Sequence, residues 1–241
     1  MRLFATFLLL AASLIWVPAA RARDPVTISG ITEPFQDVTL GLADAGIISQ
    51  QFFKEGDTVR QGDVILELDN KLETLEASRL KAVMEQNKMV YDSTRMLIDT
   101  TKSVSQEELT KAEAEYKVSA ADYDIAVEKV AHRQLVAPFT GSIAEILLKP
   151  GAASAPYQPL VRLVNISRCY FVGHVDGKAA ASLQMNEPVA IVLDGGQQVA
   201  GTICFISPTV DPASGLARVK AIFENADGHI RPGLAAQLTA N

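Results

Sequence analysis

The sequence is poor in the residues from which most catalytic and metal-binding sites are built. It has three histidines and two cysteines in 241 residues, and none of them has the spacing of a zinc site. The Gly-x-Ser-x-Gly, His-Glu-x-x-His and glycine-rich phosphate-binding motifs are also absent. We therefore predict that the protein is not an enzyme and holds no metal or cofactor.

Positive charge is not in excess either. The chain has 22 Lys and Arg against 28 Asp and Glu, a net charge of −6, and no basic patch, so no nucleic-acid partner is expected. Aromatic residues make up 6% of the chain, with Trp16 as the one tryptophan. Hydrophobic residues still reach 48%, which predicts a folded rather than a disordered protein.

A single long apolar run stands at the N-terminus. Leu3–Val17 follows Arg2, and the sequence 20–22, Ala-Arg-Ala, fits a small-x-small cleavage site. The run is shorter than the about 20 residues of a membrane span. We predict that residues 1–22 are a secretory signal peptide, with its retention as a membrane anchor as the alternative.

Export would place Cys169 and Cys204 in an oxidising compartment. There they could form a disulfide, or they could remain two buried thiols in separate strands. The sequence leaves both alternatives open.

Residues 24–69 have the pattern of β-strands. Val26–Ser29 alternates apolar and polar residues, and residues 46–48 start another short strand. Two Gly-Asp pairs in residues 55–69 predict tight turns. The residues expected to alternate onto one buried face around these turns are Val59, Val64, Leu66 and Leu68.

Glycine and proline are both absent from residues 70–133, which predicts long helices. In the second half of this stretch, large residues recur every seven positions and small residues fall three positions later, as in the seam of a coiled coil. The large residues are Leu109, Tyr116, Tyr123 and Val130, and the small ones are Ala112, Ser119 and Ala126.

The first half has a weaker seam with the same interval. It contains Ala77, Leu80, Met84, Tyr91 and Ile98, and polar residues Asn87 and Thr94 interrupt it. Ser105 and Glu108 form a capping box after a break near residues 100–105. We therefore predict a hairpin of two antiparallel helices.

Short strands return after residue 134, separated by clusters of glycine, proline, asparagine and aspartate. This spacing is typical of a β-barrel or sandwich. The predicted strands are 160–164, 170–175, 188–193, 199–206, 217–223 and 235–238.

The order of these parts resembles the periplasmic adaptor family, whose members are also called membrane fusion proteins or HlyD-like proteins. The resemblance is carried by a Gly-Asp half-module at 55–69, an Ala-Pro-Phe-x-Gly-x-Ile half-module at 137–143, and barrel motifs at 206–215, 218–219 and 231–234. It extends over residues 24–240.

The resemblance implies a mainly β fold with an inserted α-helical hairpin. It comprises a split lipoyl-like domain, or barrel-sandwich hybrid, a coiled-coil hairpin and a β-barrel domain. The implied domains are the barrel at 24–34 and 166–241, the lipoyl-like domain at 35–69 and 134–165, and the hairpin at 70–133.

The resemblance also implies a periplasmic adaptor of a tripartite efflux or secretion system. Such a protein is peripheral to, or anchored at, the inner membrane. It links an inner-membrane transporter, here of RND type, to an outer-membrane TolC-type channel, and it acts as a homo-oligomer. The residues that match the channel-binding tip of the family, with departures from its pattern, are Thr94, Arg95, Ile98 and Ser105.

Two alternatives remain. The first is a lipoyl or biotinyl carrier, since Lys71 follows the first half-module where a carrier would have its modified lysine. The second is an adaptor of an ABC-type exporter. The sequence separates the transporter classes poorly.

Overall fold

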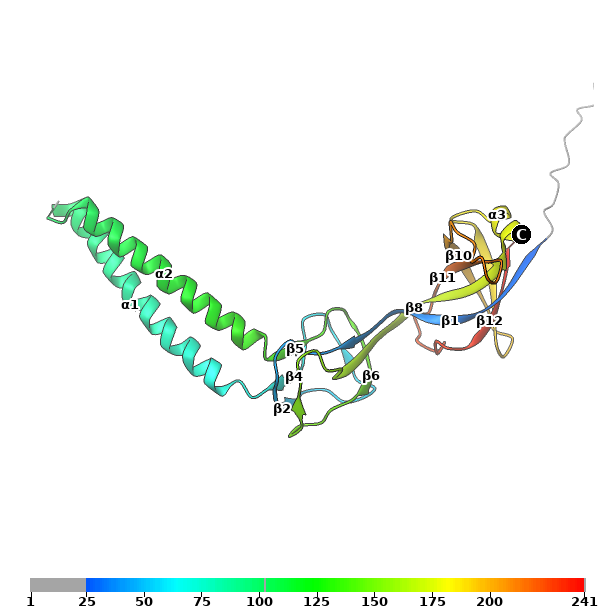
Figure 1. The fold of residues 1–241 in the computed structure, drawn as a ribbon, viewed down its shortest axis with the longest axis horizontal. Helices are drawn as coiled ribbons and strands as arrows, with labels where there is room; N and C mark the ends of the chain where they lie inside the picture. The colour runs from blue at the N-terminus through cyan, green and yellow to red at the C-terminus, as the bar shows by residue number, and fades with distance from the viewer. Residues whose placement is uncertain (1–24, 102, 241) are drawn as a thin grey trace, which may run out of the picture.

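The computed structural model describes residues 25–101 and 103–240, so the predicted signal peptide at 1–22 lies outside the described residues. The described chain is elongated. A helical hairpin lies at one end, a small β module lies in the middle and a β-barrel lies at the other end (Figure 1). The predicted fold class, mainly β with an inserted helical hairpin, is confirmed.

The middle module is built from two chain segments that the hairpin separates in sequence. The segment before the hairpin holds β2 (Gly46–Gln51), β3 (Thr58–Val59) and β4 (Val64–Leu68), and the segment after it holds β5 (Gln134–Val136), β6 (Gly141–Ile146) and β7 (Ala153–Ser154). Strand β3 pairs with β6, β4 with β5, and β2 with β7. The two halves therefore close onto each other.

The two Gly-Asp turns join the halves in the same way. Gly56 and Asp57 exchange backbone hydrogen bonds with Ile143, at 2.8 and 2.9 Å. Gly62 and Asp63 exchange equivalent bonds with the backbone of residue 137, both at 2.9 Å. Both glycines have positive φ, 88° and 92°, which other residues adopt only with strain. The two Gly-Asp turns of the first half-module therefore hold it against the second half-module through backbone hydrogen bonds.

The predicted alternation in this module is only partly right. Val59, Leu66 and Leu68 are buried, but Val64 is half-buried and Ile65 is buried in its place. The pairing register between β4 and β5 shifts between Val64 and Leu66, and such a bulge changes which side chains point inward.

The hairpin consists of α1 (Lys71–Thr101) and α2 (Gln106–Ala131), which run antiparallel. The predicted break and the Ser105–Glu108 capping box are both present. Lys71 is the first residue of α1, and its backbone N–H donates to Asp69. It therefore starts a helix instead of occupying the exposed hairpin turn that a carrier lysine requires.

Two long strands connect the module to the barrel. They are β1 (Val26–Leu40) and β8 (Val161–Asp176), which pair antiparallel with a register shift between Pro34 and Gln36. The prediction of two strands at 160–164 and 170–175 was wrong, because β8 continues through both: its first part pairs with β6 and its second part with β11. The shift accommodates Pro34, which cannot donate to a regular ladder.

Six of the described strands close into a barrel, because β1 pairs with both β12 and β8. The remaining barrel strands are β9 (Pro188–Leu193), β10 (Gln198–Ile206), β11 (Leu216–Glu224) and β12 (Ala235–Ala240). A short helix, α3 (Gly177–Ser182), was not predicted; Asp176 caps it by accepting from two backbone N–H groups.

The buried apolar side chains of the described residues form two clusters. One fills the barrel around Phe171, and the other fills the middle module around Leu163. They separate near the register shift between β1 and β8. This division agrees with the domain bounds expected from the sequence, which stay a prediction.

The structure favours free thiols over a disulfide. Cys169 lies in β8 and Cys204 in β10, with β11 between them in the sheet. Two strand spacings are about 9.6 Å, beyond the about 7 Å between Cα atoms that a disulfide can bridge. Burial raises the pKa of both thiols, which disfavours the reactive thiolate. The arrangement favours the alternative of two thiols in separate strands, of which Cys169 is buried and Cys204 is half-buried.

Candidate docking site on the helical hairpin

The hairpin is held together by the seam that the sequence predicts. In α2 the small residues Ala112, Ser119 and Ala126 are the buried ones, and the seam residues of α1 are half-buried. Tyr91 stacks on Tyr116, with ring centroids 6.1 Å apart and planes inclined by 10°. This pair fixes the register of the two helices.

The polar interruption at Asn87 also has a structural role. Its side-chain amide donates to the backbone carbonyl of Glu115 on α2, at 3.4 Å. The polar group in the seam therefore has a hydrogen-bond partner on the other helix, and this bond favours one alignment of α1 against α2.

The tip is the short connection between α1 and α2. Ser105 caps α2: its hydroxyl accepts from the backbone N–H of Glu108 at 3.2 Å, and its own N–H donates back to the Glu108 carboxylate at 3.2 Å. This exchange satisfies N–H groups that a helix start otherwise leaves free. The start of α2 at the tip thus has a defined geometry, and it lies at the end of the molecule away from the barrel (Figure 1).

The four residues predicted at the tip have different surroundings. Arg95 and Ser105 are exposed, whereas Thr94 and Ile98 are half-buried. The Thr94 hydroxyl donates to the carbonyl of Val90 one turn earlier, at 2.8 Å. Because Ile98 lies on the seam, it packs toward α2. Of the four, Arg95 is the residue best placed to contact another molecule without also supporting the hairpin.

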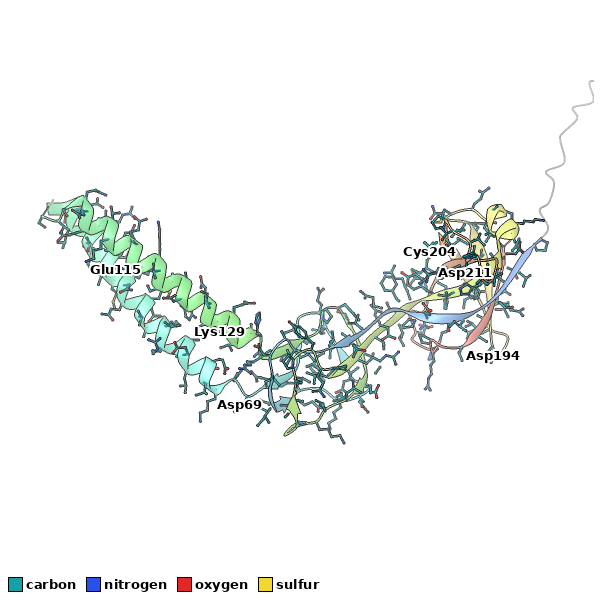
Figure 2. All side chains as sticks on the ribbon, viewed as in Figure 1. Asp69, Glu115, Lys129, Asp194, Cys204 and Asp211 are labelled. Carbon is teal, nitrogen blue, oxygen red and sulfur yellow. The ribbon has the colours of Figure 1, made fainter. Side chains whose placement is uncertain are left out.

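The base of the hairpin is tied to the β module by a network that the sequence did not indicate. The guanidinium of Arg133, just after α2, donates to Glu73 in the first turn of α1 at 2.6 Å and to the carbonyl of Ala45 at 2.7 Å. Asn70 and Gln134 both donate to the carboxylate of Glu67. Figure 2 shows Asp69 where the chain leaves the module for α1. The two helices are therefore joined to the module as one unit.

The charged groups of the hairpin form solvated pairs. The hydrogen bond from Arg79 lowers the pKa of Glu76, and the hydrogen bond to Glu113 raises the pKa of Lys117. Both shifts favour the charged forms that these groups already have near neutral pH. Both pairs are therefore ordinary charged pairs of a solvated helix surface.

Within the described ranges, no three His, Cys, Asp or Glu side chains gather as ligands of a metal ion. No helix in the described part of the chain is long and apolar enough to cross a membrane.

Comparisons with known proteins agree with this architecture. Residues 173–240 match the family described as "RND MFPs, beta-barrel domain". The chain is 25% identical to the multidrug resistance protein MdtE of Escherichia coli K12 over 237 residues, covering 86% of this chain and 61% of the relative. It is 24% identical to an uncharacterized protein of Haemophilus influenzae over 223 residues, covering 89% of this chain and 55% of the relative.

The chain thus spans less than two thirds of the length of these relatives. Among solved structures, it is similar to a MacA–MexA chimeric protein that contains the α-hairpin domain of Pseudomonas aeruginosa MexA. The TM-score is 0.78 at 17% identity, and the match covers 90% of this chain and 81% of the other. Residues 173–240 thus match the barrel domain of the RND-type membrane fusion proteins, and the described chain has the fold of a protein that carries a membrane fusion protein hairpin.

Proposed function

We propose that the protein is the periplasmic adaptor of a tripartite efflux or secretion system. It links an inner-membrane transporter, of RND type, to an outer-membrane TolC-type channel, and it contributes binding surfaces rather than chemistry. Its match to an RND-type barrel and its similarity to a multidrug resistance protein support an efflux role with an RND partner.

The observation that carries this proposal is the separation of the chain's N-terminal side from the hairpin tip. Val26 at the start of β1 pairs with Ala240 at the end of β12, so both ends of the described chain lie on the barrel side of the molecule (Figure 1). The 31 residues of α1 extend about 46 Å at 1.5 Å per residue. If residues 1–22 are retained as an anchor, they would hold the barrel side at the inner membrane while the tip points away from it; if they are cleaved, contact of the barrel side with the transporter would do the same.

Affinity purification from crosslinked cell envelopes tests this function. We expect the tagged chain to recover both a large inner-membrane transporter and an outer-membrane channel. Recovery of an ABC-type transporter in place of an RND-type one would assign the exporter alternative. Recovery of no membrane partner from either membrane would contradict the adaptor function.

We further propose that Thr94, Arg95, Ile98 and Ser105 belong to the contact with the channel. Arg95→Glu should reduce recovery of the outer-membrane channel by about ten-fold, because reversal of a charge at an interface commonly costs more than 1 kcal/mol. Recovery of the inner-membrane transporter should not change. Lys81→Glu, about four turns nearer the base, is the control.

Unchanged channel recovery with Arg95→Glu would exclude Arg95 from the contact. Ile98→Asp is a less specific variant, since its half-buried position on the seam means that a new carboxylate would also disturb the helix pair.

A further inference from the structure

A cleft lies where the middle module meets the barrel, beside the two long strands that connect them (Figure 1). Its volume is about 510 Å³, which is within the range of small-molecule sites. The barrel contributes residues of β1 and of the turn before β12, and the module contributes Ala144 of β6 and the first part of β8. A molecule in this cleft would therefore contact both the barrel and the module.

The wall of the cleft is largely apolar, and its large apolar residues belong to neither core. They are Ile31, Pro34, Val164, Ile166 and Pro232, and neither cluster of buried side chains in the described chain includes them. Ile31 is 50% exposed, although an apolar side chain gains free energy when it is removed from water. The wall can thus bury the apolar surface of a ligand without any change in either core.

One side of the cleft is held in place by Thr32. This residue is buried, and its backbone and hydroxyl exchange four hydrogen bonds with Gly233 and Leu234, at 2.7–3.2 Å. Gly233 has a φ of 102°, a conformation that glycine adopts without strain. The barrel motif at 231–234 therefore fixes Pro232 beside β1, and this side of the cleft is formed before any ligand binds.

Three charged side chains line the cleft, and two of them are acidic. Asp37 and Arg162 pair through two hydrogen bonds, so together they carry no net charge. The partner of Glu33 is Lys220, whose Nζ lies 3.7 Å from the carboxylate, beyond the length of a hydrogen bond. Lys220 is not one of the residues that line the cleft. The carboxylate of Glu33 can therefore take a further cation from the cleft side.

We propose that this cleft binds an organic monocation, a compound with an apolar body of drug size and one amine or quaternary ammonium group. The body packs on the apolar wall between Ile31 and Pro232, and the cationic group lies at Glu33. An anion is disfavoured, because the guanidinium of Arg162 is already paired with Asp37. A neutral compound would fit the wall but gain nothing from Glu33, so charge decides between ligands of one shape.

This inference deepens the proposed function, and it rests on that function for the origin of the ligand as a transported compound. The chemistry of the cleft itself requires neither membrane partner. Binding can therefore be measured on the purified chain alone.

Three fluorescent probes with the same apolar body test the charge preference. They are diphenylhexatriene, which is neutral, its cationic trimethylammonium derivative and its anionic propionic acid derivative. The fluorescence anisotropy of each probe, titrated with the purified full chain in the absence of detergent, gives its affinity. We expect saturable binding in the order cation, neutral compound, anion, with the cation bound about three-fold more tightly than the neutral probe, as for a partly exposed ion pair.

Three variants locate the binding in the cleft. Glu33→Gln should make the cationic and neutral probes bind equally, and Ile31→Gln should weaken all three probes about five-fold through lost apolar contact. Ala144→Trp fills the cleft from the module side and should weaken all three about ten-fold without removing a charge. Ile125→Gln and Glu128→Gln, at exposed positions of the hairpin, are the matched controls and should change no affinity.

Each variant should unfold at the temperature of the original chain, because all five side chains are exposed or half-buried. The proposal is overturned by the absence of saturable binding, by tightest binding of the anionic probe, by an unchanged preference for the cation in Glu33→Gln, or by unchanged binding in Ala144→Trp.

The outcome is separable from that of the proposed function. A chain that recovers both membrane partners but does not bind the cationic probe rejects the cleft alone. Probe binding in the expected order by a chain that recovers neither membrane partner rejects the adaptor function alone.

Discussion

At the scale of single residues, the closest packing in the barrel occurs where β1 meets β8. Gly30 and Gly173 face each other in the ladder, and the ring of Phe171, a fully buried side chain, fills the space above both of them. Glycine in a strand interior weakens it unless another group uses the space. Here the aromatic ring uses it.

Gly173→Ala should therefore destabilise the protein by about 1–3 kcal/mol, the usual cost of overpacking. An added Cβ would lie 2.7 Å from the Cγ2 of Ile28 and 2.8 Å from the Phe171 ring. Urea unfolding of the variant measures this loss. His174→Ala, on the exposed side of the same strand, is the control and should stay within about 0.5 kcal/mol; an equal loss in both variants would contradict the packing argument.

A second residue-scale prediction concerns Asp37 between the two cores. The guanidinium of Arg162 donates two hydrogen bonds to it, at 2.9 and 2.5 Å, and these bonds lower the pKa of Asp37 although burial raises it. A carboxyl whose pKa is lower in the folded state stabilises that state above the unfolded pKa of 3.8. The stabilisation is lost as the pH falls through the folded pKa.

In Arg162→Gln, the pKa of Asp37 should rise toward its ordinary value, which a titration of the carboxyl carbon by NMR would measure. Because the pair is partly exposed, the loss of stability at pH 7 should be small. This difference in stability between the variant and the original protein should disappear below the folded pKa of Asp37. Identical titration curves for Asp37 in both proteins would contradict the assignment of Arg162 as the cause.

At the scale of elements, the hairpin could be predicted closely and the connecting strands could not. The limits of α1 and α2 follow from the lack of glycine and proline in 70–133 and from the Ser105 cap. The continuity of β8 does not follow from its sequence, because the polar residues around Asn165 look like a break. They remain in the strand because β1 pairs with both parts of it.

The same limit applies to the candidate site. The seam could be found because it repeats every seven residues, whereas the network at the base joins residues such as Ala45, Glu73 and Arg133 that share no local pattern. Only the return of the chain after α2 brings Arg133 to the start of α1. At the tip, sequence identifies the residues but not that Ile98 is half-buried on the seam.

The base network leads to a prediction about the hairpin as an element. Arg133→Ala removes hydrogen bonds to Glu73 and to the carbonyl of Ala45, and the cost for such a largely buried charged donor is about 1–3 kcal/mol. Hydrogen exchange should become faster in the first turns of α1 and stay unchanged in the barrel. Lys117→Ala, which breaks an exposed pair with Glu113, is the control; unchanged exchange near Glu73 in Arg133→Ala would show that the base is held by packing alone.

At the scale of the whole molecule, the length of the hairpin is independent of the fold of the β module. The two antiparallel helices return the chain to the β module that it left, so the hairpin can be extended or shortened without disturbing that module. The proposed function requires the protein to span a fixed gap between two membranes. The distance that the hairpin spans can therefore be changed without preventing folding, and a pair of deletions tests this.

Removing residues 81–87 from α1 together with residues 120–126 from α2 deletes one heptad at the same level of each helix. The seam stays in register, so thermal unfolding should show a folded hairpin that is about 10 Å shorter. Channel recovery from crosslinked envelopes should be lost, while recovery of the inner-membrane transporter is kept. Removing residues 81–87 alone is the matched control: it leaves α1 one heptad short, moves the tip connection against α2, and should lower hairpin stability as well. Full channel recovery with the shortened, correctly registered hairpin would mean that its length does not set the reach of the adaptor, and the tip would then have to meet its partner by a different geometry.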